Sequence, residues 1–210
     1  MIVAIDGPAG AGKSTVARRL AERLGFRYLD TGAMYRALTW LAMQRGFDLS
    51  EGKRLGELAT ENPVEFSESG RVSIAGTDVT ASIRKSNIDR QVPVVAKHPA
   101  VREVMRERQR ELGAEGNVVI EGRDIGSVVA PDAEVKVYLV ADEAVRAARR
   151  QAERPDIGTD ALATDLKLRD ESDSARMQPA DDAERIDTTD LDVDQVVAHI
   201  EELVRAHTLA

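Results

Sequence analysis

The chain has 210 residues, 42% hydrophobic and 31% charged, which is enough for one sizeable core in a single compact domain. Its net charge of −8 argues against a general nucleic-acid or membrane-surface binder, so bound phosphates must meet local cations. The sequence contains no cysteine, which excludes disulfides, zinc fingers and thiol catalysis, and no apolar stretch reaches the roughly 18 residues of a membrane span. We therefore expect a cytoplasmic protein that binds neither nucleic acid nor membranes, with a monomer as the default.

The first predicted element is the short β-type run Ile2–Ile5, and a glycine-rich loop and a helical pattern follow it. The loop is typical of Walker A phosphate-binding sequences, because side-chain-poor residues let backbone N–H groups wrap a triphosphate. The expected nucleotide-binding residues are Gly7, Pro8, Ala9, Gly10, Ala11, Gly12, Lys13, Ser14 and Thr15. Lys13 can reach the β and γ phosphates, and the hydroxyl of Ser14 can ligate Mg²⁺. The alternative is a bare strand-to-helix turn, which would have no use for the Lys-Ser pair.

Further β-type runs recur along the chain with helical patterns between them. Together with the first they are Ile2–Ile5, Arg27–Leu29, Val118–Ile120, Val135–Val140 and Arg185–Asp187. This alternation predicts an α/β fold of the three-layer P-loop NTPase type, with a five-stranded parallel sheet covered by helices on both faces. Ligands then gather at the carboxyl ends of the strands.

The second strand leads into Asp30-Thr31-Gly32-Ala33-Met34-Tyr35-Arg36. We expect Thr31 to cap a helix and Arg36 to lie one turn further along it. A hydroxyl and a guanidinium would thus be offered to a second phosphate. The alternative is a plain capped helix with a solvated arginine.

Residues 60–90 interrupt the alternation. Val64–Phe66 and Arg71–Ile74 flank a polar link and predict an antiparallel hairpin inserted between parts of the parallel sheet. Pro99 then begins a long helix with an arginine at every fourth position from Arg102. Such a row is usually a solvated face paired with glutamates, so spacing alone does not separate Arg102 from its neighbours.

The third strand ends in Glu121-Gly122-Arg123-Asp124-Ile125-Gly126, where flanking glycines leave Arg123 and Asp124 able to face a cleft. A structural Arg–Asp pair is the alternative. After the fourth strand come a helix over 142–154, a polar break over 155–159, and a returning helix. The returning helix is expected to carry Arg169, Asp173 and Arg176 on one face, as in a hinged lid. Mutual surface salt bridges are the alternative here.

Together with Val128-Val129-Ala130-Pro131-Asp132-Ala133, these motifs resemble the bacterial cytidylate kinases, P-loop nucleoside monophosphate kinases related in fold to adenylate kinase. The similarity covers almost the whole chain. It implies transfer of the γ-phosphoryl group of ATP to CMP or dCMP, with Mg²⁺. It also implies a single kinase domain over 1–210, with a core (1–30, 91–150 and 166–210), a monophosphate-binding arm (31–90) and a lid (151–165).

The resemblance also implies roles for individual residues. Thr31, Arg36 and Arg123 would hold the acceptor phosphate, Arg102 and Asp124 the cytosine, and Arg169 and Asp173 the sugar, with Arg176 in the same pocket. Lys13, Arg123 and Arg169 would be the catalytic cations, and Ser14 the metal ligand.

One position departs from the family pattern. The family often has a serine that touches the base eight or nine residues before the arginine matched by Arg102, whereas this chain reads Gln91-Val92-Pro93-Val94-Val95. Pro93 has neither a hydroxyl nor a backbone donor, so that contact is lost or made by another residue. Two rival functions stay open. One is a P-loop kinase for another acceptor, such as UMP or a metabolite hydroxyl. The other is a GTPase-like switch, which would require an Asn-Lys-x-Asp signature that the sequence lacks.

Overall fold

The computed structural model describes residues 1–153, 158–174 and 177–209, apart from the side chains of residues 159, 160 and 169. The chain divides into two compact units. We call Met1–Leu29 with Gly116–Ala210 the sheet unit, and Asp30–Glu115 the helical unit. In the described parts of the chain, no helix combines the length and the apolar character needed to cross a bilayer.

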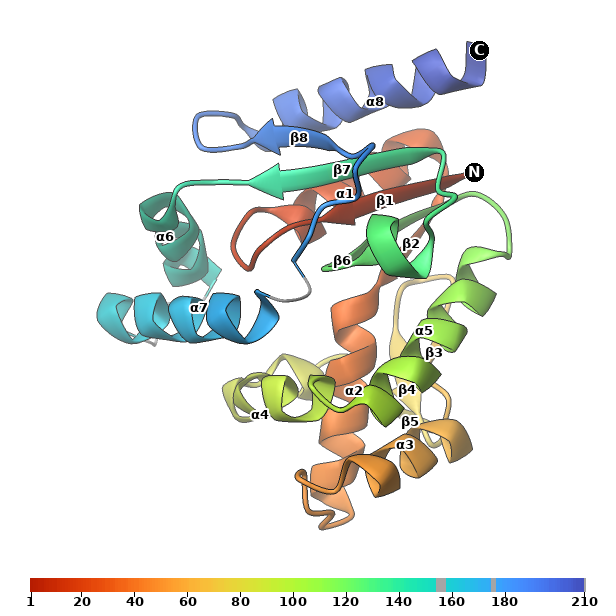
Figure 1. Cartoon of the computed structure of the whole chain (residues 1–210), viewed down its shortest axis with the longest axis vertical. Helices are drawn as coiled ribbons and strands as arrows, with labels where there is room; N and C mark the ends of the chain where they lie inside the picture. Colours follow the sequence, from red (N-terminus) through yellow and green to blue (C-terminus); the bar gives the residue numbers. More distant parts are fainter. Residues whose placement is uncertain (154–157, 175–176, 210) are drawn as a thin grey trace. The chain divides into compact units, whose positions relative to one another are not determined.

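A five-stranded sheet forms the centre of the sheet unit (Figure 1). Its strands are β1 (Ile2–Asp6), β2 (Arg27–Asp30), β6 (Val118–Gly122), β7 (Val135–Val140) and β8 (Glu184–Asp187), in the order β2-β6-β1-β7-β8. β1 pairs in parallel with β6 and with β7, and β7 pairs in parallel with β8. All five predicted strands are confirmed. Because β1 is central, the loop that follows it leaves the middle of the sheet's carboxyl edge.

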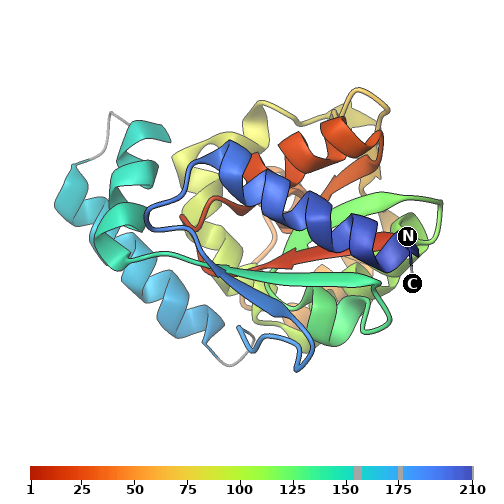
Figure 2. The ribbon, with the colours of Figure 1, turned by 90° about the horizontal axis from the view of Figure 1, so that it is seen from above.

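Helices α1 (Lys13–Leu24) and α8 (Val193–Leu209) pack on each other beside the sheet (Figure 2). Their apolar faces join the strands in one core, with Leu20 and Ile200 fully buried against Ile5 and Leu139. Gly25 ends α1 in the left-handed conformation (φ 66°), and its N–H donates to the carbonyl groups of Ala21 and Glu22.

Three further elements complete the sheet unit: η2 (Ile125–Val129), a turn of π type, and the packed helices α6 (Glu143–Glu153) and α7 (Thr159–Asp173). Residues 155–157 of the predicted polar break over 155–159 lie outside the described residues, as does residue 154, the expected end of the preceding helix. α7 ends at Asp173, and Arg176 also lies outside the described residues.

The helical unit contains the predicted insertion. Its elements are α2 (Thr31–Gln44), α3 (Gly52–Glu61), β3 (Glu65–Phe66), β4 (Val72–Ile74), β5 (Thr77–Asp78), η1 (Ser82–Arg84), α4 (Ser86–Ala96) and α5 (Pro99–Gly113). β3 and β4 form the predicted antiparallel hairpin, and β5 adds a third antiparallel strand that the pattern did not indicate. α5 packs against α3, and α4 packs against α2. This unit extends to Glu115, beyond residue 90 where we expect the monophosphate-binding arm to end, and the boundaries of the functional arms stay a prediction.

The core of the sheet unit yields a stability prediction. Replacing Leu20, which is fully buried in α1, with Ala should lower the free energy of unfolding by about 2–5 kcal/mol, because it leaves a cavity. The control is Leu168→Ala in α7, where the side chain is 58% exposed and the change should stay within about 0.5 kcal/mol. Urea unfolding measures both variants. Equal effects of the two changes would contradict this description of the core.

Candidate active site

The glycine-rich loop runs from β1 to α1 in a conformation that side chains would prevent. Gly7, Gly10 and Gly12 have φ values of 145°, 78° and 91°, a region that other residues rarely adopt. A Cβ atom on Gly7 would lie 2.2 Å from the carbonyl oxygen of Leu139 in β7. One on Gly10 would lie 2.9 Å from the carbonyl oxygen of Arg146 in α6. The glycines therefore allow both the turn itself and its close packing on β7 and α6.

Side chains from distant elements bind the carbonyl oxygens of this loop at alternate positions. The pairs are Arg123 Nη1 with Gly7 (2.9 Å), Arg146 Nη1 with Ala9 (3.1 Å) and Thr188 Oγ1 with Ala11 (3.2 Å). Carbonyl groups that are held in this way leave backbone N–H groups to line the other side of the turn, which is the geometry of an anion-binding nest. Gly12 precedes the first turn of α1, whose N–H groups and positive dipole end add to the attraction for an anion.

Lys13 is buried at the base of this loop, with 7% of its surface exposed. Its Nζ atom donates to the carbonyl oxygen of Pro8 at 2.7 Å. Burial, and secondarily the nearby Arg123 guanidinium, lower the pKa of Lys13 to about 7. A phosphate group that contacts Nζ would supply the negative charge that favours the ammonium form, so the site is prepared for a polyanion.

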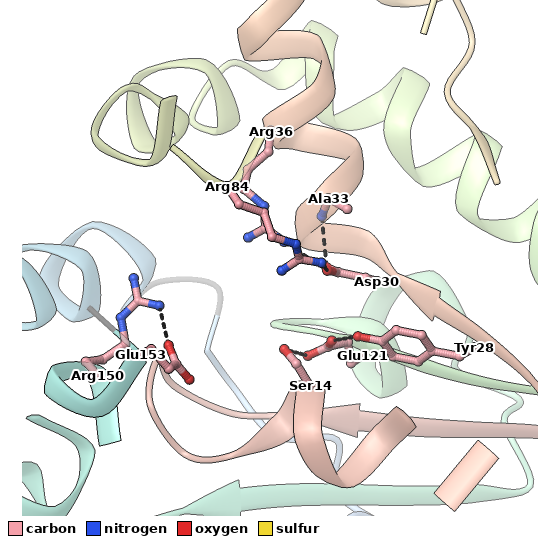
Figure 3. A network of polar contacts seen from close by, with 9 residues as sticks. All are labelled: Ser14, Tyr28, Asp30, Ala33, Arg36, Arg84, Glu121, Arg150 and Glu153. Carbon is pink, nitrogen blue, oxygen red and sulfur yellow. Dashed lines mark hydrogen bonds and ion pairs between the residues drawn. The ribbon is translucent and has the colours of Figure 1, made fainter. Parts of the chain in front are cut away.

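Ser14 lies beside a carboxylate that the motif itself does not contain. Its hydroxyl donates to Oε2 of Glu121 at 2.9 Å, and the hydroxyl of Tyr28 donates to Oε1 of the same carboxylate (Figure 3). Hydroxyl and carboxylate oxygens suit Mg²⁺, which prefers oxygen ligands. Within the described residues, no group of three His, Asp or Glu side chains forms a protein-only metal cage. Ser14 and Glu121 thus offer oxygen donors of the kind that Mg²⁺ prefers.

The turn after β6 brings Arg123 into contact with the phosphate loop. Besides binding Gly7, Arg123 directs its Nε atom to the carboxylate of Asp173 at 3.0 Å. Asp173 is the last residue of α7, so one guanidinium connects the loop, the turn and the returning helix. The side chain of Arg169 lies outside the described residues, as does Arg176. Both predicted roles stay predictions.

α6 and the end of β8 also contact the loop. Besides binding Ala9, Arg146 pairs with Asp170 of α7 at 2.7 Å. Arg149 donates to the side chain and the carbonyl of Thr188 at 2.9 and 2.7 Å. Both arginines lie in the helix expected over 142–154, but their contacts with backbone carbonyl groups were not foreseen. Sequence reasoning missed Thr188 altogether, because a threonine after a short strand carries no motif.

In the helical unit, the N-terminus of α2 holds the second set of candidates. The predicted cap is wrong: Asp30, not Thr31, caps α2, and its Oδ1 accepts from the N–H of Ala33 at 2.8 Å (Figure 3). Asp30 matches N-cap preferences as well as Thr31 does, and it lies one residue earlier, at the end of β2. Thr31 is instead the first helical residue and is buried.

Two arginines approach the same oxygen of Asp30. Nη2 of Arg36 lies 2.9 Å and Nη2 of Arg84 lies 3.9 Å from Oδ2 (Figure 3). Guanidinium groups beside a helix N-terminus are groups that can bind a phosphate. Arg36 was predicted; Arg84 was missed, because it comes from η1, 54 residues after Asp30, and lies in no recognisable motif. Arg102 lies in the first turns of α5 and is half-buried.

Comparison with known proteins identifies the relationship. The family model described as cytidylate kinase matches residues 3–206. The chain belongs to the cytidylate kinase family. The cytidylate kinase of Anoxybacillus flavithermus (strain DSM 21510 / WK1) is 49% identical, over 94% of this chain and 93% of that protein. That of Shouchella clausii (strain KSM-K16) is 46% identical, over 98% and 96%. That of Bacillus subtilis (strain 168) is 45% identical, over 96% and 95%.

Solved structures support the fold at lower sequence identity. A shikimate kinase from Bacteroides thetaiotaomicron aligns with a TM-score of 0.55 at 18% identity, covering 98% of each chain. A gluconokinase from Sinorhizobium meliloti 1021 aligns with a TM-score of 0.53 at 16% identity, covering 98% of this chain and 93% of its own. These likenesses concern the fold alone, and they confirm the predicted α/β fold class of the P-loop kinases.

The lowered pKa of Lys13 generates a binding prediction. At pH 8 its side chain is mostly neutral in the ligand-free protein, and phosphates bound at Nζ raise the pKa again. Binding of ATP should therefore take up close to one proton, which calorimetry in buffers of different ionisation enthalpy measures. The control is Lys13→Arg, whose guanidinium keeps its proton throughout and should show almost no uptake. Binding by the parent protein without proton uptake would contradict the assignment of Lys13 to the phosphates.

Proposed function

We propose that this chain is a cytidylate kinase that transfers the γ-phosphoryl group of ATP to CMP or dCMP, giving ADP and CDP or dCDP. The observation that carries the proposal is the family match over residues 3–206. The contact of Lys13 Nζ with the carbonyl oxygen of Pro8, which keeps this lysine at the phosphate loop, supports it. The acidic net charge of −8 fits a protein whose anionic ligands meet local clusters of cations. We further propose that the enzyme acts as a monomer in the cytoplasm and needs no nucleic acid or membrane.

On the donor side, residues 7–15 would bind the ATP phosphates. The nest and the N-terminus of α1 supply N–H donors, and Lys13 supplies a positive charge next to the transferring group. Ser14, supported by Glu121, would hold Mg²⁺, which when bound neutralises charge on the β and γ phosphates. The chain's own contribution to the chemical step is mainly electrostatic, because the acceptor phosphate is already anionic and needs no general base.

On the acceptor side, the roles follow the family pattern. Thr31, Arg36 and Arg123 would bind the acceptor phosphate, Arg102 and Asp124 the base, and Arg169, Asp173 and Arg176 the sugar side of the pocket. Cytosine presents an exocyclic amine that a carboxylate accepts from, whereas uracil presents a carbonyl that a carboxylate repels. Asp124 is thus the residue that would reject UMP. Pro93, which lies inside α4, cannot make the serine contact that is frequent in the family.

The segment over 151–165 would act as a lid. Pro155 and Gly158 lie between α6 and α7, and a break of this composition between two packed helices suits a hinge. Closure of such a lid would exclude the water that could otherwise accept the phosphoryl group. Arg123 and Arg169 would then add cationic charge around the transferring group.

Release of ADP, measured by a coupled assay over CMP, dCMP, UMP and AMP, tests the function. We expect CMP and dCMP to be the preferred acceptors. Lys13→Ala should lower turnover by about 10²–10³-fold with the fold intact, because it removes charge stabilisation in the transition state. Lys53→Ala, at an exposed position of α3, is the matched control and should leave turnover unchanged. Activity on non-nucleotide acceptors alone would overturn the proposal, and tight GDP binding without any transfer would favour a nucleotide switch.

Asp124→Asn tests whether Asp124 discriminates cytosine from uracil in the acceptor. An amide can donate as well as accept, so the variant should tolerate the uracil carbonyl, and the ratio of kcat/KM for CMP to that for UMP should fall by about tenfold or more. Asp132→Asn, an exposed position just after η2, carries the same chemical change and should keep the parent ratio. An unchanged ratio in Asp124→Asn would show that another residue reads the base.

A further inference from the structure

Asp6, the last residue of β1, is a buried carboxylate to which the reaction assigns no role. Only 5% of its surface is exposed. Its Oδ1 atom accepts from the N–H of Ile125 at 2.9 Å, and its Oδ2 atom accepts from the N–H of Gly126 at 2.8 Å. Both oxygens of one side chain thus bind consecutive backbone N–H groups that are 119 and 120 residues away in the sequence.

These two N–H groups begin η2. The first N–H groups of any helical turn have no partner inside the turn and need an acceptor from elsewhere. Usually the residue just before the turn provides it, which here would be Asp124. In this chain the acceptor is Asp6, which comes from another strand. Asp124 occupies the N-cap position of η2, and its side chain does not cap the turn. Asp124 is the residue expected to bind the base.

The register of the sheet makes this contact possible. β1 and β6 run in parallel with Asp6 opposite Gly122, so the end of β1 lies beside the start of the turn. The next residue, Gly7, accepts from Nη1 of Arg123 through its carbonyl oxygen. Two consecutive residues of β1 and the phosphate loop therefore bind the turn on both sides of Asp124.

We infer that Asp6 is a positioning residue that fixes the turn over Gly122–Gly126, and through it sets the placement of Arg123 and Asp124 for the acceptor nucleotide. The inference rests on the proposed function, because it assigns these two residues to the acceptor. An ionised carboxylate suits two backbone N–H donors, because both of its oxygens accept hydrogen bonds and neither donates. An asparagine in its place would turn an NH₂ group toward one of the two N–H groups.

Burial supports the same argument. It raises the pKa of Asp6 to about 6, and the neighbouring Asp124 adds to the effect, while the two N–H groups and Lys13 oppose it. Asp6 is thus a costly place for a negative charge. An asparagine would avoid the cost of burying a negative charge. It would, however, lose one of the two contacts in which the carboxylate accepts from a backbone N–H.

The test is Asp6→Asn in the full-length enzyme, with Asp48→Asn as the matched control. Asp48 also accepts from a backbone N–H, that of Ser50 at 2.8 Å, but it lies exposed in the helical unit between α2 and α3. For Asp6→Asn we expect CMP to bind about tenfold more weakly or worse, and ATP measured without CMP to bind within about threefold of the parent. Hydrogen exchange at Ile125 and Gly126 should accelerate, with exchange in β6 unchanged. Asp48→Asn should match the parent in all three measurements.

Three results would each overturn the inference. The first is unchanged CMP binding, and the second is unchanged exchange at Ile125 and Gly126. The third is an equal loss of ATP and CMP binding together with a lower Tm, which would mark Asp6 as a general structural residue. If Asp6→Asn does not fold, Asp6→Ser, which retains one acceptor oxygen, is measured against the same outcomes. The parent enzyme separates this inference from the function. A parent that does not phosphorylate CMP refutes the function, whereas an active parent with an unaffected variant refutes only the role of Asp6.

Discussion

The site depends on one constraint: the backbone of the phosphate loop must be held from outside so that its N–H groups remain available inside. Carbonyl oxygens of the loop are bound by side chains from the turn after β6, from α6 and from the end of β8. The glycines make this possible, because a Cβ atom on Gly7 or Gly10 would collide with the backbone of β7 or α6. The loop is thus not an independent motif. Its conformation is set by three other segments of the sheet unit.

The same arrangement buries two titratable groups, Lys13 and Asp6, whose contributions to stability change with pH in opposite directions. Lys13, whose pKa is lowered, holds its proton less well when folded than when unfolded, so its contribution to stability grows as pH rises from about 7 toward its ordinary pKa of 10.5. Asp6, whose pKa is raised, binds its proton more tightly when folded, so its contribution declines as pH rises from 3.8 to about 6. At neutral pH both groups therefore cost stability in the ligand-free fold, as is common where function decides which residues are buried.

Local sequence patterns were sufficient to predict the strands, the phosphate loop, the hairpin and the helix that begins at Pro99, because each of these depends on neighbours within a few residues. The features that were missed have partners far away in the sequence. Asp6 meets Ile125 only through the register of β1 with β6, and Arg84 approaches Asp30 from η1, beyond the hairpin in the sequence. The helix cap moved from Thr31 to Asp30 because two adjacent residues can both serve, and the start of α2 decides between them. Glu121 belongs to the motif at the end of the third strand, but the motif does not indicate that its carboxylate lies beside the hydroxyl of Ser14.

The contacts of Arg146 bear on how a lid could influence the donor site. This guanidinium binds the carbonyl of Ala9 in the phosphate loop and the carboxylate of Asp170 in α7. Arg123 makes a second connection of the same kind, from Gly7 to Asp173 at the end of α7. Because both arginines join the loop to α7, a displacement of that helix has to break these contacts or carry the loop's carbonyl groups with it. Movement of the returning helix and the shape of the anion-binding nest are therefore coupled through the two ion pairs Arg146–Asp170 and Arg123–Asp173.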